Sequence, residues 1–180
     1  MLTVQRQDSA AMLSRQQPAR PREGQPRPND EQLEVWRQYL RTHAAITRQL
    51  DAELARDHGL GLSEYEVLLF LSRAPGNQMR LIRLAEESLV TRSGMTRLIT
   101  RLEERGLVER LRCPSDRRGF NAHMTDAGRD LARAAGKTHL AGVKRLFVDP
   151  LAEELGPLGT SLERLPDTPD DALPPCEPGD

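Results

Sequence analysis

Aromatic residues make up only 3% of the 180-residue sequence, and long apolar runs are missing. The longest purely apolar segment is VLLFL at 67–71, far short of the roughly 20 residues that a membrane-spanning helix needs. Leucine, alanine and arginine are plentiful, which favours helix over sheet. The first residues lack the apolar segment of a secretion signal. We therefore expect a mainly helical, cytoplasmic protein without a membrane partner.

Cysteine and the motifs of common enzymes are also scarce. Cys113 and Cys176 stand far apart, which argues against a disulfide scaffold and fits a reducing compartment. No CxxC or HxxxH spacing is present, so we expect no metal and no cofactor, with a metal site assembled between two subunits as an open alternative. The GxSxG, P-loop, dinucleotide and HExxH motifs are absent. The sequence therefore does not predict an enzyme.

The formal net charge of −1 hides an uneven distribution of charge. Residues 1–28 are polar, mildly basic and interrupted by prolines. Residues 166–180 contain five prolines and five acids but no lysine or arginine. Both segments are predicted to be disordered arms, and the folded domain is expected at 29–165.

Apolar periodicity within 29–165 predicts helices and a single β-hairpin. The expected helix starts are Asn29 or Asp30, Ser63 with Glu66 as its capping box, Thr91, and Asp149 followed by Pro150. The helices are expected at 29–57, from 63 to about 74, and at 81–88, 91–105, 126–148 and from 149 onward. The strands are expected at 107–112 and 120–125, joined by a CPSDRRG turn.

Three short helices followed by a hairpin form the element order of a winged helix-turn-helix. The predicted fold class is thus mainly α with a small β-hairpin wing. The winged-helix lobe is expected at 62–125. Long helices at 29–57 and 126–165 flank it.

The segment VTRSGMTRLITRLEERGLVER at 90–110 combines an apolar stripe with many arginines. At about 100° per residue, the stripe consists of Met95, Leu98, Ile99 and Leu102. The opposite face and its flanks present Ser93, Thr96, Arg97, Thr100, Arg101 and Glu104. Hydroxyls and guanidiniums suit base edges and phosphates, and a helix N-terminus favours phosphate. Gly94 would let the backbone approach another surface closely, and DNA is one candidate.

The arginines continue into the expected hairpin. Between 91 and 118 there are eight arginines against four acids, in a chain whose total charge is −1. A basic loop tip suits the negative potential of a narrow minor groove. For the helix alone, a solvated amphipathic helix is an equal alternative; the basic turn that follows favours DNA.

The stretch LVTRSGMTRLITRLEERGLVER, the DRR at 116–118 and the MTDAG at 124–128 occur in that order. Together they resemble the MarR family of bacterial transcription regulators. The likeness covers about 30–165. It implies an obligate homodimer, formed by the helices at 29–57 and 126–165, on a pseudo-palindromic site in double-stranded DNA. It also implies a repressor released by a small aromatic or anionic effector.

The resemblance places helix 91–105 in the major groove and the wing arginines in the minor groove. Asp116 would brace the wing by ion pairing. The DNA contacts that it implies are Thr91, Arg92, Ser93, Thr96, Arg97, Arg101, Arg112, Arg117 and Arg118. The LGPLG at 155–159 departs from the family pattern, because its glycines and Pro157 should kink or split the last helix.

The signal that would switch such a regulator is open. Tyr39, His43 and Tyr65 could line an effector pocket near the lobe junction, and ordinary core packing is the alternative for the aromatic residues. Cys113 lies between Arg112 and the wing arginines, where cations raise thiol reactivity, so oxidation is a second candidate switch. A packing role for Cys113 is its alternative. A winged-helix module that binds protein instead of DNA remains a separate functional hypothesis.

Overall fold

The structure is a computed structural model that describes residues 27–88, 90–113 and 116–165, without the side chains at 113 and 116–118. The chain divides into two units, 1–37 and 38–180. The predicted tail at 166–180 and all but the last two residues of the predicted arm at 1–28 lie outside the described residues. Within the described ranges, no helix is long and apolar enough to cross a membrane.

Helix α1 (Asp30–His58) begins at a reciprocal cap. The Gln32 N–H donates to Asn29 Oδ1 over 2.8 Å, and the Asn29 N–H donates to Gln32 Oε1 over 2.9 Å. Of the two caps expected from the sequence, Asn29 is therefore the one used. The helix ends where Gly59 adopts a left-handed φ of 60°, a conformation that glycine reaches without strain.

Helix α2 (Leu62–Arg73) starts two residues earlier than the cap Ser63 predicted, so that prediction was wrong. Glu64, not Glu66, accepts the N–H of the cap residue Gly61 over 3.1 Å. Asp51 of α1 accepts the Leu62 N–H over 2.7 Å, a contact that only the folded chain supplies. Glu66 is instead half-buried, and its loss of hydration raises the pKa of its carboxyl.

The winged-helix lobe contains three antiparallel strands in the order β1-β3-β2. They are β1 (Gln78–Arg80), β2 (Val108–Cys113) and β3 (Asp116–Met124). The predicted hairpin corresponds to β2 and β3, with Val108 opposite Met124. Strand β1 adds an edge that the sequence analysis missed, with Met79 opposite Ala122. The predicted turn at 113–119 is also too long, because β3 already begins at Asp116.

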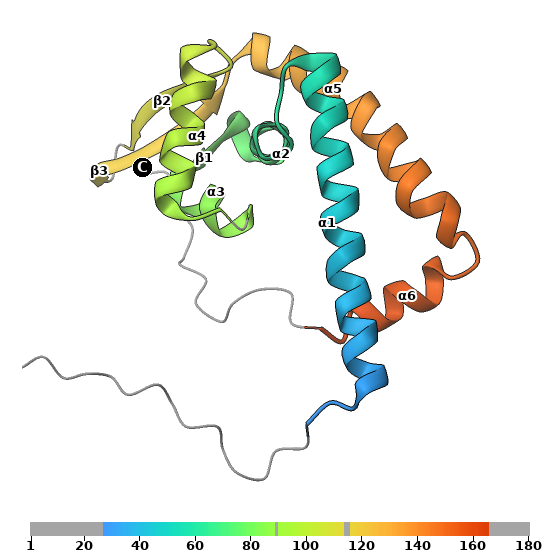
Figure 1. The fold of residues 1–180 in the computed structure, drawn as a ribbon. Helices are drawn as coiled ribbons and strands as arrows, with labels where there is room; N and C mark the ends of the chain where they lie inside the picture. Colours follow the sequence, from blue (N-terminus) through green and yellow to red (C-terminus); the bar gives the residue numbers. More distant parts are fainter. Residues whose placement is uncertain (1–26, 89, 114–115, 166–180) are drawn as a thin grey trace, which may run out of the picture. The chain divides into compact units, whose positions relative to one another are not determined.

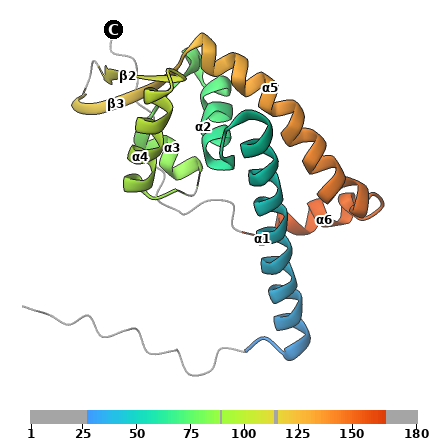
Figure 2. The same cartoon turned by 45° about the horizontal axis from the view of Figure 1, so that its top comes forward.

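Helices α3 (Leu81–Glu87) and α4 (Arg92–Glu104) lie beside these strands (Figure 1, Figure 2). A 3₁₀ turn, η1 (Pro75–Asn77), leads into β1. The lobe core consists of side chains that are at most 6% exposed, and it draws on every large element of the lobe. Its members include Leu54, Leu68, Leu71, Leu84, Ile99, Leu102, Val108 and Met124.

Helix α5 (Asp126–Val143) begins where Thr125 Oγ1 accepts the Gly128 N–H over 3.1 Å. It continues through a π-helical segment, η2 (Lys144–Val148), into a 3₁₀ turn, η3 (Asp149–Leu151). Figure 2 shows the chain then bending back into α6 (Leu155–Leu162).

The predicted start of the last helix at Asp149 was wrong. A turn at 152–154 separates η3 from α6, so the expected split occurs before the LGPLG segment and not within it. Pro157 is the third residue of α6, where a backbone N–H would have no acceptor inside the helix. The proline is therefore tolerated without breaking α6.

Candidate nucleic-acid interface

The two faces of α4 separate as its apolar periodicity predicts. Met95, Leu98, Ile99 and Leu102 are at most 3% exposed and pack in the lobe core, which confirms the predicted stripe. Ser93, Arg97 and Glu104 lie opposite them and are exposed. The outward face of α4 is thus polar, and cationic in its first turns.

The predicted cap of α4 is confirmed, since Thr91 Oγ1 accepts the Gly94 N–H over 3.1 Å. Contacts within the chain also explain why position 94 is a glycine. A Cβ at this position would lie 2.9 Å from Val90 Cγ1 and 3.1 Å from Thr91 Oγ1. The glycine therefore makes room for the cap itself, and this accounts for it without a close approach to DNA.

The arginines of α4 fall into two groups. The side chains of Arg92 and Arg97 are exposed and make no hydrogen bond or ion pair with the residues that the structure describes. In contrast, Arg101 Nε lies 3.1 Å from Glu64 Oε1 of α2, and Arg105 Nη1 lies 3.3 Å from Glu64 Oε2. Arg92 and Arg97 are therefore available to an anionic partner, whereas Arg101 is engaged within the lobe.

Thr96 and Thr100 have local partners. The Thr96 hydroxyl donates to the Arg92 carbonyl, and the Thr100 hydroxyl donates to the Thr96 carbonyl, each over 3.0 Å. Thr100 Oγ1 also accepts from Arg110 of β2 over 2.6 Å. Thr96 remains exposed, while Thr100 is partly covered.

Known proteins share this arrangement. A model of the MarR family matches residues 58–119. AbsC, a MarR family transcriptional regulator from Streptomyces coelicolor, is 36% identical, with a TM-score of 0.71 over 77% of this chain and 94% of AbsC. Sco3205, another MarR family regulator from that organism, solved in complex with DNA, is 31% identical, with a TM-score of 0.69 over 78% of this chain and 96% of Sco3205.

The chain belongs to the MarR family of transcription regulators. A curated relative, the HTH-type transcriptional repressor Rv2887 of Mycobacterium tuberculosis, is 30% identical over 125 residues, which are 69% of this chain and 88% of that protein. The resemblance inferred from the sequence motifs is thereby confirmed.

The wing of this MarR family protein is described only in part. Arg112 is exposed on β2 and pairs with Phe120 of β3 across the sheet. Residues 116–118 belong to β3, but their side chains and that of Cys113 lie outside the described part of the structure. The wing contacts of Arg117 and Arg118, the brace by Asp116 and the redox role of Cys113 stay predictions.

The three residues suggested for an effector pocket have different surroundings. Tyr39 is 51% exposed, and its ring stacks on His43 at a centroid distance of 6.2 Å. Tyr65 is 4% exposed in the lobe core, and its ring lies 4.8 Å from that of His139 on α5. Burial raises the pKa of the Tyr65 hydroxyl and lowers the pKa of His139. The effector pocket itself stays a prediction.

His139 should make the stability of this MarR family protein pH-dependent. Its Nδ1 is buried without a hydrogen-bond partner among the described residues, and burial holds its pKa below the usual 6.5. As the pH falls through 6.5, the unfolded chain binds a proton that the folded chain does not, so the free energy of unfolding decreases. His139→Phe keeps a ring beside Tyr65 and should flatten this decrease. Urea unfolding of both proteins at about pH 7.5 and about pH 5.5 gives the change in the free energy of unfolding between the two pH values. An equal change in the wild type and in His139→Phe would contradict the assignment to His139.

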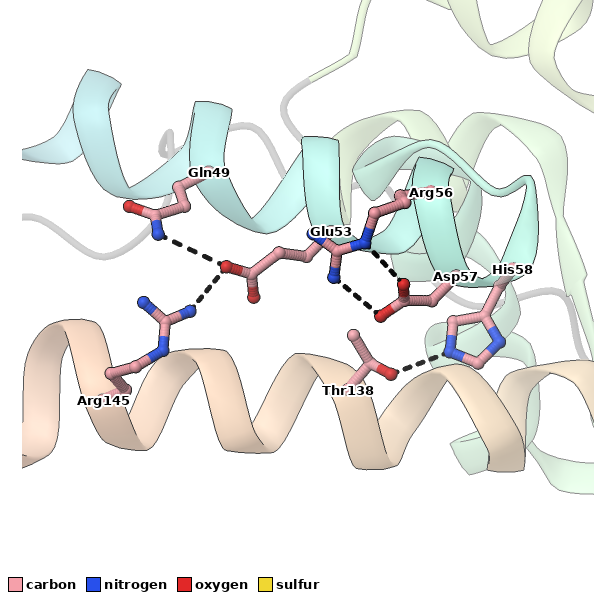
Figure 3. Close-up of polar contacts among 7 residues, drawn as sticks. All are labelled: Gln49, Glu53, Arg56, Asp57, His58, Thr138 and Arg145. Atoms are coloured by element: carbon pink, nitrogen blue, oxygen red, sulfur yellow. Dashed lines mark hydrogen bonds and ion pairs between the residues drawn. The ribbon is translucent and has the colours of Figure 1, made fainter.

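Polar contacts also join α1 to α5 and to η2, which continues it (Figure 3). Glu53 accepts from Arg145 over 2.5 Å and from Gln49 over 3.3 Å. Farther along, His58 Nε2 lies 2.8 Å from Thr138 Oγ1. No sequence motif reveals the contacts of α1 with α5 and η2, because they join residues about 80 to 90 positions apart.

Proposed function

We propose that this protein is a homodimeric repressor that binds a pseudo-palindromic operator through α4 and the wing. The observation that supports this most directly is the outward face of α4, where Arg92, Ser93 and Arg97 are exposed at a capped helix N-terminus. The likeness to Sco3205, which was solved in complex with DNA, supports the same function.

The chemistry of this face fits the major groove. Arg97 can donate two hydrogen bonds to O6 and N7 of a guanine, while a serine hydroxyl can donate or accept. The N-terminus of α4 carries a partial positive charge, so it favours a phosphate near Arg92 and Ser93. Arg117 and Arg118 would add minor-groove or phosphate contacts from the wing.

Dimerisation is supported by large apolar side chains that the single chain leaves between 44% and 68% exposed. An apolar surface of this kind marks a protein interface when its members are contiguous. These side chains are Val35, Trp36, Tyr39, Leu40, Leu140, Leu162 and Leu165. A small aromatic or anionic effector that favours a dimer geometry unsuited to DNA would release the operator.

The direct test is a titration of the purified protein against DNA fragments that flank its coding region, with excess competitor DNA and at two salt concentrations. Saturable binding of one fragment that weakens steeply with salt would support the proposal. Equal binding of all fragments would point to an operator elsewhere or to nonspecific binding. No binding at low salt would favour the protein-interaction hypothesis.

Arg118→Ala should weaken binding to operator and nonspecific DNA alike. Each lost phosphate contact lowers the slope of log affinity against log salt concentration by about one unit. The measurement is a salt titration of both duplexes. Arg133→Ala is the control, because Arg133 on α5 is exposed and pairs only with Asp130 among the described residues. A slope equal to that of the wild type would remove Arg118 from the interface.

A further inference from the structure

Helix α4 is held on one flank by a single carboxylate. Glu64 of α2 has a side chain that is only 12% exposed, yet it faces both Arg101 and Arg105. The two arginines are one helical turn apart, so one carboxylate can engage both. The same carboxylate accepts the Gly61 N–H at the start of α2, which fixes its position.

The opposite flank of α4 is held by Arg110 of β2. Its Nη2 donates to Thr100 Oγ1 over 2.6 Å and to the Thr96 carbonyl over 3.2 Å, and its Nη1 lies 3.3 Å from Glu103. The Arg110 side chain is 27% exposed. The planar guanidinium therefore contacts three positions spread over two turns of α4.

These contacts lie on both sides of the DNA-facing surface. At about 100° per residue, positions 96, 100 and 103 fall on one side of the apolar stripe, and positions 101 and 105 fall on the other. Between the two flanks, opposite the stripe, lie Ser93, Arg97 and Glu104. Glu64 and Arg110 thus restrain rotation of α4 about its own axis from both directions.

Rotation of α4 matters for base recognition because side chains lie far from the helix axis. At a radius of about 6 Å, a rotation of about 20° displaces a side chain by about 2 Å. Bidentate hydrogen bonds between Arg97 and a guanine tolerate much less than this. A small change in helix rotation would therefore weaken base contacts while leaving the arginines close to phosphates.

We propose that Glu64 and Arg110 are positioning residues that set the operator preference of α4 without touching DNA. The proposal rests on the DNA-binding function proposed above. The proposal also gives Arg101 a structural role, the ion pair with Glu64 of α2, in place of a phosphate contact.

Glu64→Gln distinguishes the two roles of Glu64, which are its ion pairs with the arginines of α4 and its hydrogen bond at the start of α2. Glutamine at this position can still accept the Gly61 N–H, as in a capping box, but it loses the charge that holds both arginines. The ratio of operator affinity to nonspecific affinity should fall by about fivefold to tenfold. Nonspecific affinity should rise, because Arg101 and Arg105 become free to reach phosphates.

Glu109→Gln is the matched control for charge. Glu109 is exposed on β2, and its side chain makes no hydrogen bond or ion pair with the residues that the structure describes. Its loss should raise affinity for all DNA slightly and leave the ratio unchanged.

Arg110→Lys tests the other flank without changing charge. An ammonium cannot serve the three acceptors of the guanidinium together, so the ratio should fall by about fivefold while the salt slope stays the same. Arg101→Gln should leave the salt slope of operator binding unchanged. A slope lower by about one unit would show that Arg101 contacts phosphate and would overturn the structural role given to it.

Thermal unfolding identifies the variants that fold. The ratio of operator affinity to nonspecific affinity is then compared among the folded variants. A ratio within about twofold of the wild type in any folded variant of Glu64 or Arg110 overturns the proposal. A wild type that does not distinguish its operator from nonspecific DNA would instead overturn the proposed function, so the two failures are distinguishable.

Discussion

Replacing Arg97 with alanine should reduce affinity for the operator by about tenfold to a hundredfold, equivalent to about 1–3 kcal/mol. Arg97 is exposed opposite the apolar stripe of α4 and has no hydrogen-bond or ion-pair partner in the described ranges. Its loss should cost little stability but should relax base preference at one position of the operator. Quantitative binding to the operator and to single-base variants of it measures both effects.

Two further substitutions sharpen the experiment on Arg97. Arg97→Lys keeps the charge but not the bidentate geometry, so it should retain nonspecific affinity and still lose base preference. Arg133→Ala on α5 removes an exposed arginine away from α4 and should change neither. If Arg97→Ala kept the operator affinity and base preference of the wild type, Arg97 would not be a residue that recognises bases.

Replacing Gly128 with alanine should destabilise the protein by about 3 kcal/mol, because the new methyl group has no space. A Cβ at Gly128 would lie 2.2 Å from the Leu107 carbonyl oxygen and 3.0 Å from Met124 Cγ. The first of these atoms belongs to the backbone and cannot rotate away. The Thr125 N–H donates to the same carbonyl over 3.1 Å, which holds the start of α5 against the residue that precedes β2. Thermal unfolding should show a decrease in Tm of roughly 10 °C.

Gly156→Ala is the matched control for Gly128→Ala. Gly156 is also near the start of a helix, but outside that helix turn no atom of the described ranges lies within 4 Å of the position that a Cβ would occupy there. Alanine at 156 should change the free energy of unfolding by less than about 1 kcal/mol, in the stabilising direction. Equal Tm values for the two variants would show that the close approach of Gly128 to Leu107 carries no energetic weight.

Local sequence signals predicted those parts of the lobe that depend on neighbouring residues. The period of the apolar side chains in α4 identified its buried face, and Thr91 identified its start. The alternation at 120–125 likewise predicted the C-terminal half of β3, because a strand with one face in the core repeats every two residues. The motif order then identified the family.

Features that depend on distant residues were not predictable in this way. Strand β1 is only three residues long, too short to show an alternation, and it is a strand because β3 pairs with it. The start of α2 is set by Asp51 on α1, and no local pattern at Ser63 reveals that. The contact between Arg101 and Glu64 joins residues 37 positions apart and forms no motif, so the sequence alone does not reveal it.

The crowded start of α4 has a consequence for altering which operators the protein recognises. Because a side chain at Gly94 would collide with Val90 and with the capping hydroxyl of Thr91, these three positions form a unit that should be kept intact in a mutant library. Arg92 and Arg97 are exposed outside that unit, and Ser93 contacts it only through its hydroxyl, which lies 3.3 Å from Thr91 Oγ1. These three positions can be randomised while Thr91 keeps its hydrogen bond to the Gly94 N–H. Selection for new operators should therefore recover folded variants with substitutions at 92, 93 and 97 while glycine persists at 94.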